Sequence, residues 1–265
     1  MSETPVLQLV DLSHVYVNEK GAALVLEGLR LSLSRGEFLS LVGPSGCGKT
    51  TVLNLLAGLF PPTMGRVLLG GETVTGPSPK VGYMLQQDYL FPWRSIRDNA
   101  AIGLEINGTK TRASMSAVDE VLSELGLGGY GSRYPHELSG GMRQRVALAR
   151  TLVTEPEVLL LDEPFSALDL HIKLQLEELV QRTLKRLGKT AVLVTHDLAE
   201  AAAMSDRVIV MGRNPGRFRS ELVVPEEIRT ATPMDARKLP AFQDIFEQLW
   251  SQLHAVEREG GEDSG

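Results

Sequence analysis

The chain has 265 residues, of which 43% are hydrophobic and 23% charged, and its formal net charge is −6 at pH 7. This composition predicts a folded, enzyme-sized protein. It excludes a disordered chain, whose apolar content would be lower. The acidic balance argues against nucleic acid as a partner, because proteins that neutralise a phosphate backbone rely on clustered Lys and Arg.

The first part of the chain is predicted to be β structure. Apolar runs at residues 6–10, in a stretch ending near Val17, and at residues 29–33 and 38–42 are separated by polar or Gly-containing breaks. A helix follows, because apolar residues recur at helical spacing over residues 49–59. These runs predict four strands and then a helix.

Two adjacent glycines, Gly70 and Gly71, lie between the short runs at residues 67–69 and 72–74. Both central positions of the favoured hairpin turn need positive φ, which glycine adopts without strain. The sequence therefore predicts a two-residue hairpin here.

The second half combines helices with short, almost unbroken apolar runs. Helices are predicted at 112–125 and 140–152, inside a segment of about 88–150 that forms a helical insertion. Beyond it, apolar runs alternate with helical segments, with runs at 158–161, 191–194 and 208–211 and helices at 170–187 and 197–204. This alternation is typical of a parallel sheet covered by helices.

The C-terminal part, 239–253, carries large apolar residues on one helical face. We expect this face to pack on the chain's own core, with docking against a second protomer or a membrane partner as the alternative. The polar residues 257–265 are expected to be a disordered tail.

Residues 43–50 fit the phosphate-loop pattern G-x-x-x-x-G-K-[ST] between a predicted strand and a predicted helix. In such a loop backbone N–H groups point at the phosphates, Lys49 reaches the β and γ oxygens, and Thr50 offers a hydroxyl to Mg²⁺. The predicted nucleotide-binding residues are Gly43, Pro44, Ser45, Gly46, Cys47, Gly48, Lys49, Thr50 and Thr51. The alternative is a Gly-rich turn without a ligand.

Two acids, Asp162 and Glu163, follow the apolar run at residues 158–161. A carboxylate at the end of a buried parallel strand can meet the metal beside the phosphates, so Asp162 is the predicted Mg²⁺ ligand. Glu163 is expected to polarise the water that attacks the γ-phosphate of ATP. An acidic pair that merely begins a loop is the alternative, which the phosphate loop in the same chain disfavours.

The sequence Leu-Ser-Gly-Gly-Met-Arg-Gln at 138–144 matches the LSGGQ-type signature of ABC ATPases, except at Met142, where that pattern most often has Gln. Ser139 can cap the helix that follows, and a helix N-terminus with two glycines offers N–H donors to an anion; a capped helix without a ligand is the alternative. Over residues 5–220 the chain resembles the nucleotide-binding subunit of an ABC transporter.

This resemblance implies an α/β fold: a P-loop NTPase core with a mainly parallel sheet, an N-terminal antiparallel β subdomain, and an inserted helical subdomain at about 88–150. Residues 221–256 then form a C-terminal extension. It also implies that Ser139, Gly140 and Gly141 bind the γ-phosphate of ATP held by the opposite copy of an ATP-bound homodimer.

Further roles come from the same resemblance. Gln86 corresponds to a glutamine that senses Mg²⁺, with Gln87 as the alternative, and residues 166–169 correspond to a dimer-contact loop that ends at Asp169. His196 corresponds to a histidine that contacts the γ-phosphate, although a lone histidine after a strand is more often structural. Tyr16 corresponds to an aromatic residue that stacks on adenine, with a strand-end tyrosine that meets no ligand as the alternative.

The implied site consists of two overlapping sets of residues. The predicted catalytic residues are Glu163, His196, Gln86 and Lys49, and the predicted metal ligands are Thr50, Gln86 and Asp162. The cofactors are therefore ATP and Mg²⁺.

The segment Tyr89 to Trp93 puts large apolar groups in a predicted loop. By resemblance this loop faces a transmembrane permease, and the alternative is that its aromatics fold back into the helical insertion. Together with the dimer-contact loop and residues 213–217, it resembles the importer branch that includes nitrate, sulfonate and taurine systems. That branch implies import of a small polar solute and, indirectly, a substrate-binding protein.

Rival functions are an ATP-dependent regulatory clamp, a non-transport ABC ATPase, and a stand-alone P-loop kinase, which leaves the signature unexplained. The chain has no secretion-signal pattern and no run of roughly 18 to 20 apolar residues. We expect a peripheral subunit at the cytoplasmic face of the inner membrane, soluble when isolated. Cys47, the single cysteine, cannot form an internal disulfide and is expected to be partly exposed in the empty phosphate loop.

Overall fold

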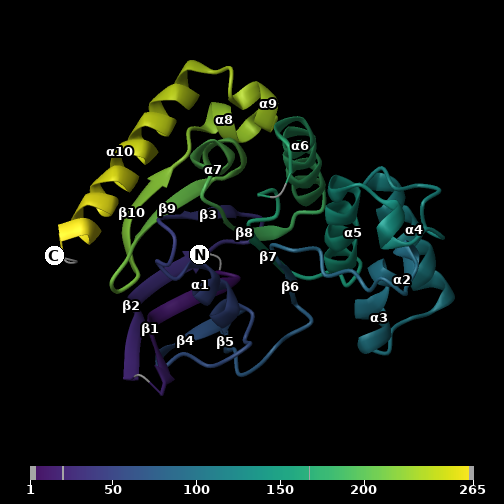
Figure 1. Cartoon of the computed structure of the whole chain (residues 1–265), viewed down its shortest axis with the longest axis horizontal. Coiled ribbons are helices and arrows are strands. Elements are labelled where there is room, and N and C mark those ends of the chain that lie inside the picture. The colour runs from purple at the N-terminus through teal and green to yellow at the C-terminus, as the bar shows by residue number, and fades with distance from the viewer. Residues whose placement is uncertain (1–3, 20, 167, 263–265) are drawn as a thin grey trace.

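Two β-sheets form the body of the protein. The structure is a computed structural model that describes residues 4–19, 21–166 and 168–262. The antiparallel sheet has the order β2-β1-β4-β5 and occupies the lower part of Figure 1. Its strands are β1 (Leu7–Asn18), β2 (Gly21–Leu33), β4 (Met64–Leu69) and β5 (Glu72–Thr73).

The second sheet has the order β10-β9-β3-β8-β7-β6. Its strands are β3 (Phe38–Val42), β6 (Val81–Met84), β7 (Val158–Asp162), β8 (Thr190–Val194), β9 (Arg207–Gly212) and β10 (Arg217–Val223). Neighbouring strands from β9 to β6 are parallel, and only the edge strand β10 is antiparallel to its neighbour. The mixed sheet with an antiparallel partner confirms the predicted fold class.

Local chemistry explains how the antiparallel sheet departs from the predicted strands. β1 is one strand rather than two, with an irregular register around Asp11, whose φ is 48°. The β4–β5 hairpin turns at Gly70 and Gly71, whose φ values are 59° and 86°. Positive φ at both positions confirms the predicted two-residue turn.

The central strands β3, β7 and β8 are buried at every position, as their apolar runs predict. Successive side chains point to opposite faces of the sheet. Thus Leu159 of β7 joins the core formed with α5 (Gly140–Leu152) and α6 (Leu170–Arg186), whereas Leu160 joins the core formed with α1 (Lys49–Leu56) and the antiparallel sheet.

Neither β6 nor β10 is predicted from the sequence. β6 has only four residues, one of which is Gly82, and β10 is an edge strand in which exposed side chains alternate with half-buried ones and the buried Leu222. Neither strand therefore carries the unbroken apolar run by which buried parallel strands are recognised.

The segment predicted as a helical insertion forms a lobe at the right of Figure 1. It contains α2 (Ile96–Ala100), α3 (Ile102–Ile106), α4 (Arg112–Glu124) and α5. α4 starts at a capping box between Thr111 and Ser114 and is followed by Gly126 at φ 73°, which is typical of a helix C-terminus.

The C-terminal helix α10 (Pro240–Glu262) runs along the outer edge of the molecule, beside α7 (Leu198–Met204) and β9. Phe242, Ile245 and Leu249 are buried in a core shared with these two elements, so the expected packing on the chain's own core is confirmed. Trp250, which the sequence places on the same face, is 52% exposed.

Residues 257–262, which the sequence predicts to belong to a disordered tail, continue α10 to its end at Glu262. Once packing has formed a helix, each further residue adds a backbone hydrogen bond at little extra cost, so a polar end can continue it. The last three residues, 263–265, lie outside the described residues.

Within the described parts of the chain, none of the helices is both long and apolar enough to span a bilayer.

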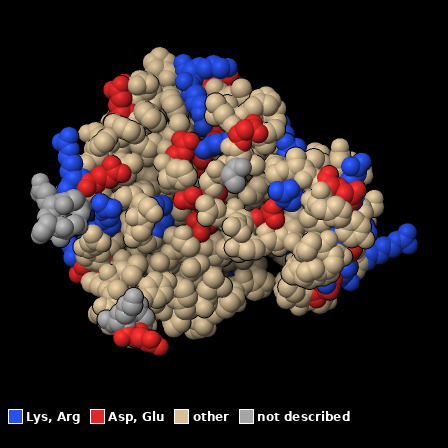
Figure 2. Space-filling model, viewed as in Figure 1, with Lys and Arg blue, Asp and Glu red and all other residues tan. Residues whose placement is uncertain are grey.

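Figure 2 shows Lys, Arg, Asp and Glu intermingled over the upper part of one face and a broad uncharged area over β4 and β5.

Candidate active site

The phosphate loop joins β3 to α1 in a conformation that its glycines permit. Gly46 and Gly48 have φ values of 78° and 99°, which L side chains rarely adopt. At Gly43 an added Cβ would lie 2.7 Å from the carbonyl oxygen of Met211. The chain therefore enters α1 through a turn that a larger residue would strain at three positions.

A cleft of about 470 Å³ opens over this loop. It is lined by Ser45, Gly46, Gly48, Lys49, Thr50, Thr51, Val25, Glu163 and His196. The Nζ of the buried Lys49 donates hydrogen bonds to the carbonyl oxygens of Gly43 at 2.7 Å and Pro44 at 3.1 Å. Because these partners are neutral, the ammonium charge is available to an anion in the cleft.

Asp162 ends β7 beside Thr50. Its Oδ1 accepts a hydrogen bond from Thr50 Oγ1 at 3.3 Å, and its Oδ2 accepts one from the Tyr83 hydroxyl at 3.5 Å. Burial raises the pKa of Asp162, and the neighbouring charge of Glu163 raises it further. A buried carboxylate and a hydroxyl oxygen beside a phosphate loop are donors that suit Mg²⁺, which prefers oxygen ligands and commonly shares them with phosphates.

The Glu163 carboxylate contacts two other predicted site residues. Its Oε2 lies 3.2 Å from Gln86 Nε2 and 3.2 Å from His196 Nδ1. Glu163 itself has φ 45°, a strained value for a side-chain-bearing residue of the kind that clusters at active sites. The end of β7 thus holds one carboxylate beside Thr50 and the next among Gln86 and His196.

Tyr16 lies on β1 at the edge of the cleft, and 40% of its surface is exposed. Its hydroxyl is 3.5 Å from Thr51 Oγ1, and its ring makes edge contacts with His14 at 4.7 Å and Phe60 at 5.9 Å between ring centroids. Burial lowers the pKa of His14, which favours the neutral ring in this aromatic group. A partly exposed ring braced from behind can stack on a planar ligand.

The signature residues do not line the phosphate cleft. Ser139 caps α5 by accepting a hydrogen bond from Met142 N, and a Cβ added to Gly141 would lie 2.5 Å from Ile172 Cγ2. Gly140 lines a second cavity of about 510 Å³, together with Gln86 and other residues. Within one copy, these three residues are therefore separated from the site they are predicted to complete.

Asp169 is another predicted residue that does not line the phosphate cleft. Its side chain caps α6 by accepting a hydrogen bond from Ile172 N at 3.2 Å. Ala167, in the same predicted dimer-contact loop, lies outside the described residues.

The expectation that Cys47 is partly exposed is wrong. Its side chain is 1% exposed and packs in the core between the phosphate loop and the sheets. Burial raises the pKa of the thiol, and this outweighs the opposing effect of Lys49. The loop presents its backbone to the cleft and turns this side chain away from it.

Two residues outside the predicted set hold the site together. Ser166 Oγ accepts a hydrogen bond from Gln86 Nε2 at 3.3 Å and donates one to the Glu163 carbonyl oxygen at 3.0 Å. Gln144 Nε2 donates to the Gln86 carbonyl oxygen at 3.1 Å. Of the two candidate glutamines, Gln86 is the one that contacts Glu163. A serine and a glutamine have no distinctive chemistry, so only their position inside a motif could have marked them.

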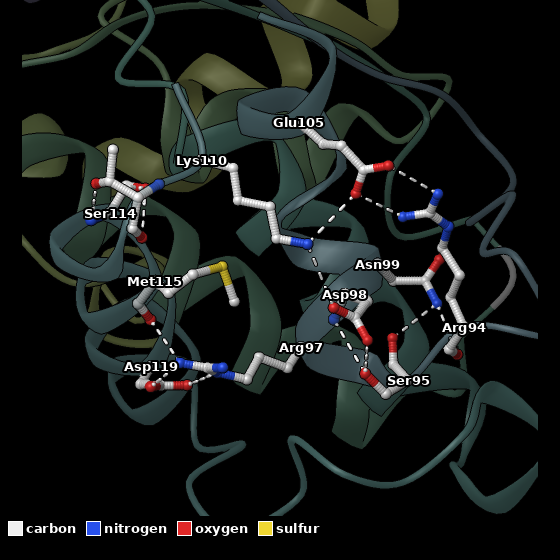
Figure 3. A network of polar contacts seen from close by, with 11 residues as sticks. Arg94, Ser95, Arg97, Asp98, Asn99, Glu105, Lys110, Ser114, Met115 and Asp119 are labelled. Atoms are coloured by element: carbon white, nitrogen blue, oxygen red, sulfur yellow. Dashed lines mark hydrogen bonds and ion pairs between the residues drawn. The ribbon is translucent and has the colours of Figure 1, made fainter. Parts of the chain in front are cut away.

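Asn99 fastens the loop with the aromatic residues, and Figure 3 shows how it lies beside Arg94 and Ser95. The fully buried Asn99 accepts a hydrogen bond from Phe91 N at 2.7 Å and donates to the carbonyl oxygens of Phe91, Arg94 and Ser95 at 3.0 to 3.1 Å. Arg94 also forms a double hydrogen bond with Glu105, which lowers the pKa of that carboxyl to about 2. Hydrogen bonds to α2 and α3 thus hold the loop in place.

This fastened loop presents aromatic surface to solvent. Trp93 is 71% exposed and Tyr89 is 59% exposed, whereas Leu90 is buried and the half-buried Phe91 lies 5.4 Å from Trp93 between ring centroids. Only part of the segment folds back into the helical lobe.

Comparisons with known proteins agree with this geometry. The family model described as "ABC transporter" matches residues 26–166. The chain is 48% identical to the uncharacterized ABC transporter ATP-binding protein YtlC of Bacillus subtilis (strain 168), over 96% of this chain and 97% of that protein.

Two import proteins are similar over most of their length. The chain is 40% identical to the taurine import ATP-binding protein TauB of Roseobacter denitrificans, covering 88% of each chain. It is 37% identical to the nitrate import ATP-binding protein NrtD of a Synechocystis strain, covering 96% of this chain and 97% of that one. Among solved structures, the dimeric post-hydrolysis state of the ATP-binding cassette MJ0796 with ADP and Pi superposes with a TM-score of 0.72 at 28% identity, covering 83% of this chain and 99% of that one.

Proposed function

The chain belongs to the ABC transporter family and is an ATP-binding subunit that hydrolyses ATP, and from this premise we propose that it powers the import of a small polar solute through a separate transmembrane subunit. The observation that carries the proposal is the Glu163 carboxylate, held at the phosphate cleft by contacts with Gln86 and His196. The proposed ABC domain spans residues 5–220, and residues 221–256 form an extension.

Glu163 acts as the general base in this proposal. Its carboxylate lines the cleft in which Lys49 also lies, so a water between it and the γ-phosphate of ATP would be polarised as it attacks. Gln86 and His196 both contact the same Glu163 oxygen and so orient the carboxylate. His196 is exposed enough to meet the γ-phosphate as well.

The ground-state contacts to ATP come from other residues. The glycine-rich turn and the start of α1 hold the phosphates, the Lys49 ammonium offsets their charge, and Tyr16 stacks on the adenine. Thr50 and Asp162 would hold Mg²⁺, with Gln86 nearby, and the ion would offset charge on the β- and γ-phosphates.

A second copy of the chain completes each site. Ser139, Gly140 and Gly141 lie at the N-terminus of α5, away from the phosphate cleft of their own copy, so in this proposal they bind the nucleotide of the partner. Two such sites related by a two-fold axis close a dimer. The similarity to a cassette whose solved structure is dimeric supports this arrangement.

The aromatic loop is the proposed contact with the membrane partner. Exposed aromatic groups on an ordered loop favour a protein interface, and this loop directly follows Gln86. The similarity to taurine and nitrate import proteins supports an importer of a small polar solute, which it would receive from a substrate-binding protein. We therefore propose that the chain works at the cytoplasmic face of the membrane.

The first test is the Glu163→Gln variant. We expect steady-state ATP hydrolysis to fall by at least about 100-fold, because the amide cannot take a proton from water, while ATP affinity stays within a few-fold of the wild type. The same variant should accumulate as an ATP-bound dimer in size-exclusion chromatography with light scattering.

The matched control is Glu157→Gln, at the opposite end of β7, where Glu157 pairs with Arg35 and Lys80. It should hydrolyse ATP at the wild-type rate. Near-normal turnover by Glu163→Gln would refute the general-base assignment, and a monomer at high protein and ATP concentration would refute the proposed dimer.

A further inference from the structure

A cluster of charged side chains, two of them buried, lies next to His196 in the chain and joins α6, α7 and the short helix α9 (Pro233–Ala236). The cluster consists of Lys173, Glu177, Asp197, Glu200 and Arg237. The side chains of Glu177 and Glu200 are 0% and 2% exposed. None of the roles assigned above uses this charge cluster.

Lys173 is the centre of the charge cluster. Its Nζ lies 2.7 Å from Asp197 Oδ2, 2.8 Å from Glu200 Oε2 and 4.0 Å from Glu177 Oε1. Asp197 and Glu200 belong to the loop and helix that follow His196, whereas Lys173 lies in the first turn of α6, where its backbone N–H bonds to the Asp169 carbonyl oxygen. One ammonium therefore joins the start of α6 to the histidine loop.

Asp197 directly follows His196 and uses both of its carboxylate oxygens. Oδ1 accepts hydrogen bonds from the backbone N–H groups of Ala199 at 2.8 Å and Glu200 at 3.1 Å, which caps α7. Oδ2 accepts the bond from Lys173 at 2.7 Å. Lys173 thus sets the orientation of the residue next to His196 and, through it, the start of α7.

The C-terminal segment closes the charge cluster from the other side. Arg237, one residue beyond α9, donates to Glu177 Oε2 at 2.6 Å and to the Pro233 carbonyl oxygen at 2.8 Å. Glu177 is one helical turn after Lys173, so Arg237 and Lys173 share this carboxylate. The segment after β10 is thereby joined to the histidine loop through two charged residues of α6.

Stability alone does not account for the charge cluster. It buries the carboxylates of Glu177 and Glu200 and places the partly exposed Asp197 beside them with two cations. Glu177 Oε1 and Glu200 Oε1 accept no hydrogen bond. Because charged groups lose their hydration on burial, a buried ion cluster often stabilises a fold less than apolar residues of the same volume would. The burial of Glu200 raises its pKa to about 7. Directional ion pairs also fix the relative orientation of the side chains that they join.

We propose that Lys173 is a positioning residue for His196, and that Arg237 holds Lys173 and Glu177 in place, so that the C-terminal segment supports ATP hydrolysis through the histidine loop. The inference rests on the role proposed for His196. A displacement of about 1 Å at a catalytic group can cost up to about 100-fold in rate, so loosening this loop slows the chemical step.

The first measurements are kcat and KM for ATP on the full-length variants. Lys173→Met should lower kcat on the order of 10-fold with KM within about 2-fold, because the phosphate loop is untouched. Lys173→Arg keeps a cation that reaches the same carboxylates and should recover most of the wild-type kcat. A loss of kcat that Lys173→Arg does not relieve would overturn the proposal.

Arg237→Gln tests the link to the C-terminal segment and also serves if Lys173→Met does not fold. It should lower kcat several-fold with unchanged KM, and speed hydrogen exchange at the amides of Ala199 and Glu200 more than in β3. The neighbouring Lys238→Gln is the matched control, because Lys238 is 71% exposed and pairs only with Asp235 among the described ion pairs. Equal effects of Arg237→Gln and Lys238→Gln would overturn the link.

Double variants with His196→Ala separate the inference from the proposed function. If His196→Ala alone turns over at the wild-type rate, the role proposed for His196 fails. If His196→Ala is slow, adding Arg237→Gln or Lys173→Met should lower kcat no further, because their effect passes through the same histidine. Losses that multiply in the double variants would overturn the inference while leaving the role of His196 intact.

Discussion

At the scale of single residues, the surroundings of a side chain decide its chemistry more than its place in a motif does. Cys47 lies two residues before Lys49 in the phosphate loop, yet its thiol is packed among apolar side chains. The thiolate is the reactive form of cysteine, and burial both raises the pKa of this thiol and blocks access to it.

We therefore expect native Cys47 to resist iodoacetamide and to react only in denaturant. Alkylation of the native protein should stay near zero both with and without ATP and Mg²⁺, because unfolding exposes the thiol and nucleotide binding does not. Mass spectrometry of the adduct measures the rate, and a Ser116→Cys variant, with an added thiol on the exposed side of α4, is the reactive control. Rapid alkylation of the native wild type that ATP slows would show that the thiol faces the cleft.

Glu200 gives a pH-dependent contribution to stability. Burial raises its pKa from 4.5 to about 7, so the folded state binds a proton more tightly than the unfolded state does. The stabilising contribution of the protonated form is complete below pH 4.5 and is lost as the pH rises through about 7.

Urea unfolding of wild type and Glu200→Gln at pH 5 and pH 8 measures this contribution. The free energy of unfolding of the wild type, relative to the variant, should fall by up to about 3 kcal/mol over that range, because each unit of pKa shift corresponds to about 1.4 kcal/mol. Glu247→Gln, at an exposed position of α10, should show no such trend. A wild-type advantage that grows toward pH 8 would contradict the assignment.

At the scale of elements, amphipathic pattern and capping explain where helices lie, and tertiary contacts decide which apolar residue is covered. Leu249 and Trp250 are adjacent in α10, but Leu249 is fully buried against α7 and β9 whereas Trp250 is 52% exposed. Trp250 instead stacks along the helix with Phe246, at 6.5 Å between ring centroids.

Leu249→Ala should lower the free energy of unfolding by about 2 to 5 kcal/mol, because it leaves a cavity in a packed core. Trp250→Ala should cost less, about 1 kcal/mol or below, because about half of this residue is in solvent and it is not part of the buried core. Urea unfolding monitored by far-UV circular dichroism gives both values. Equal costs for the two substitutions would mean that α10 does not pack through the face described.

At the scale of the whole molecule, three parts of the proposed machinery lie at different places in the fold: the phosphate cleft, the signature helix and the aromatic loop. The cleft lies at the ends of β3 and β7, the signature glycines begin α5, and Trp93 lies in the loop before α2. Gln86 connects these three parts, because it contacts Glu163, is held by Gln144 of α5, and precedes the aromatic loop.

We expect Trp93→Ala to leave ATP affinity and the melting temperature unchanged, because the indole is exposed, but to abolish assembly with the transmembrane subunit. The measurement is purification of the tagged chain from detergent-solubilised membranes of its own organism, with the membrane partner identified by mass spectrometry. Trp250→Ala, which alters another exposed tryptophan, should retain the partner.

Taurine or nitrate uptake into vesicles that contain the wild-type complex then tests the proposed direction and class of solute. Retention of the membrane partner by Trp93→Ala would refute the aromatic loop as the contact, and ATP-dependent export from the vesicles would refute import.

The sequence by itself determined the elements whose cause is local. The run at 158–161 is apolar throughout, and the run at 38–42 is apolar except for Ser40, because β7 and β3 are covered on both faces. The phosphate loop, Asp162 and Glu163 follow from residue types at fixed spacing. The turn at Gly70 and Gly71 and the stripe on α10 are local in the same sense.

Only the tertiary structure decided which groups meet. The Cys47 thiol is buried because β3 and α1 close over it, and β10 is a strand because β9 offers it an unpaired edge. The contacts of Glu163 with His196, and of Lys173 with Asp197, join residues 33 and 24 positions apart in the chain. Such contacts depend on which strands are neighbours in the sheet, and no local pattern of residues encodes that order.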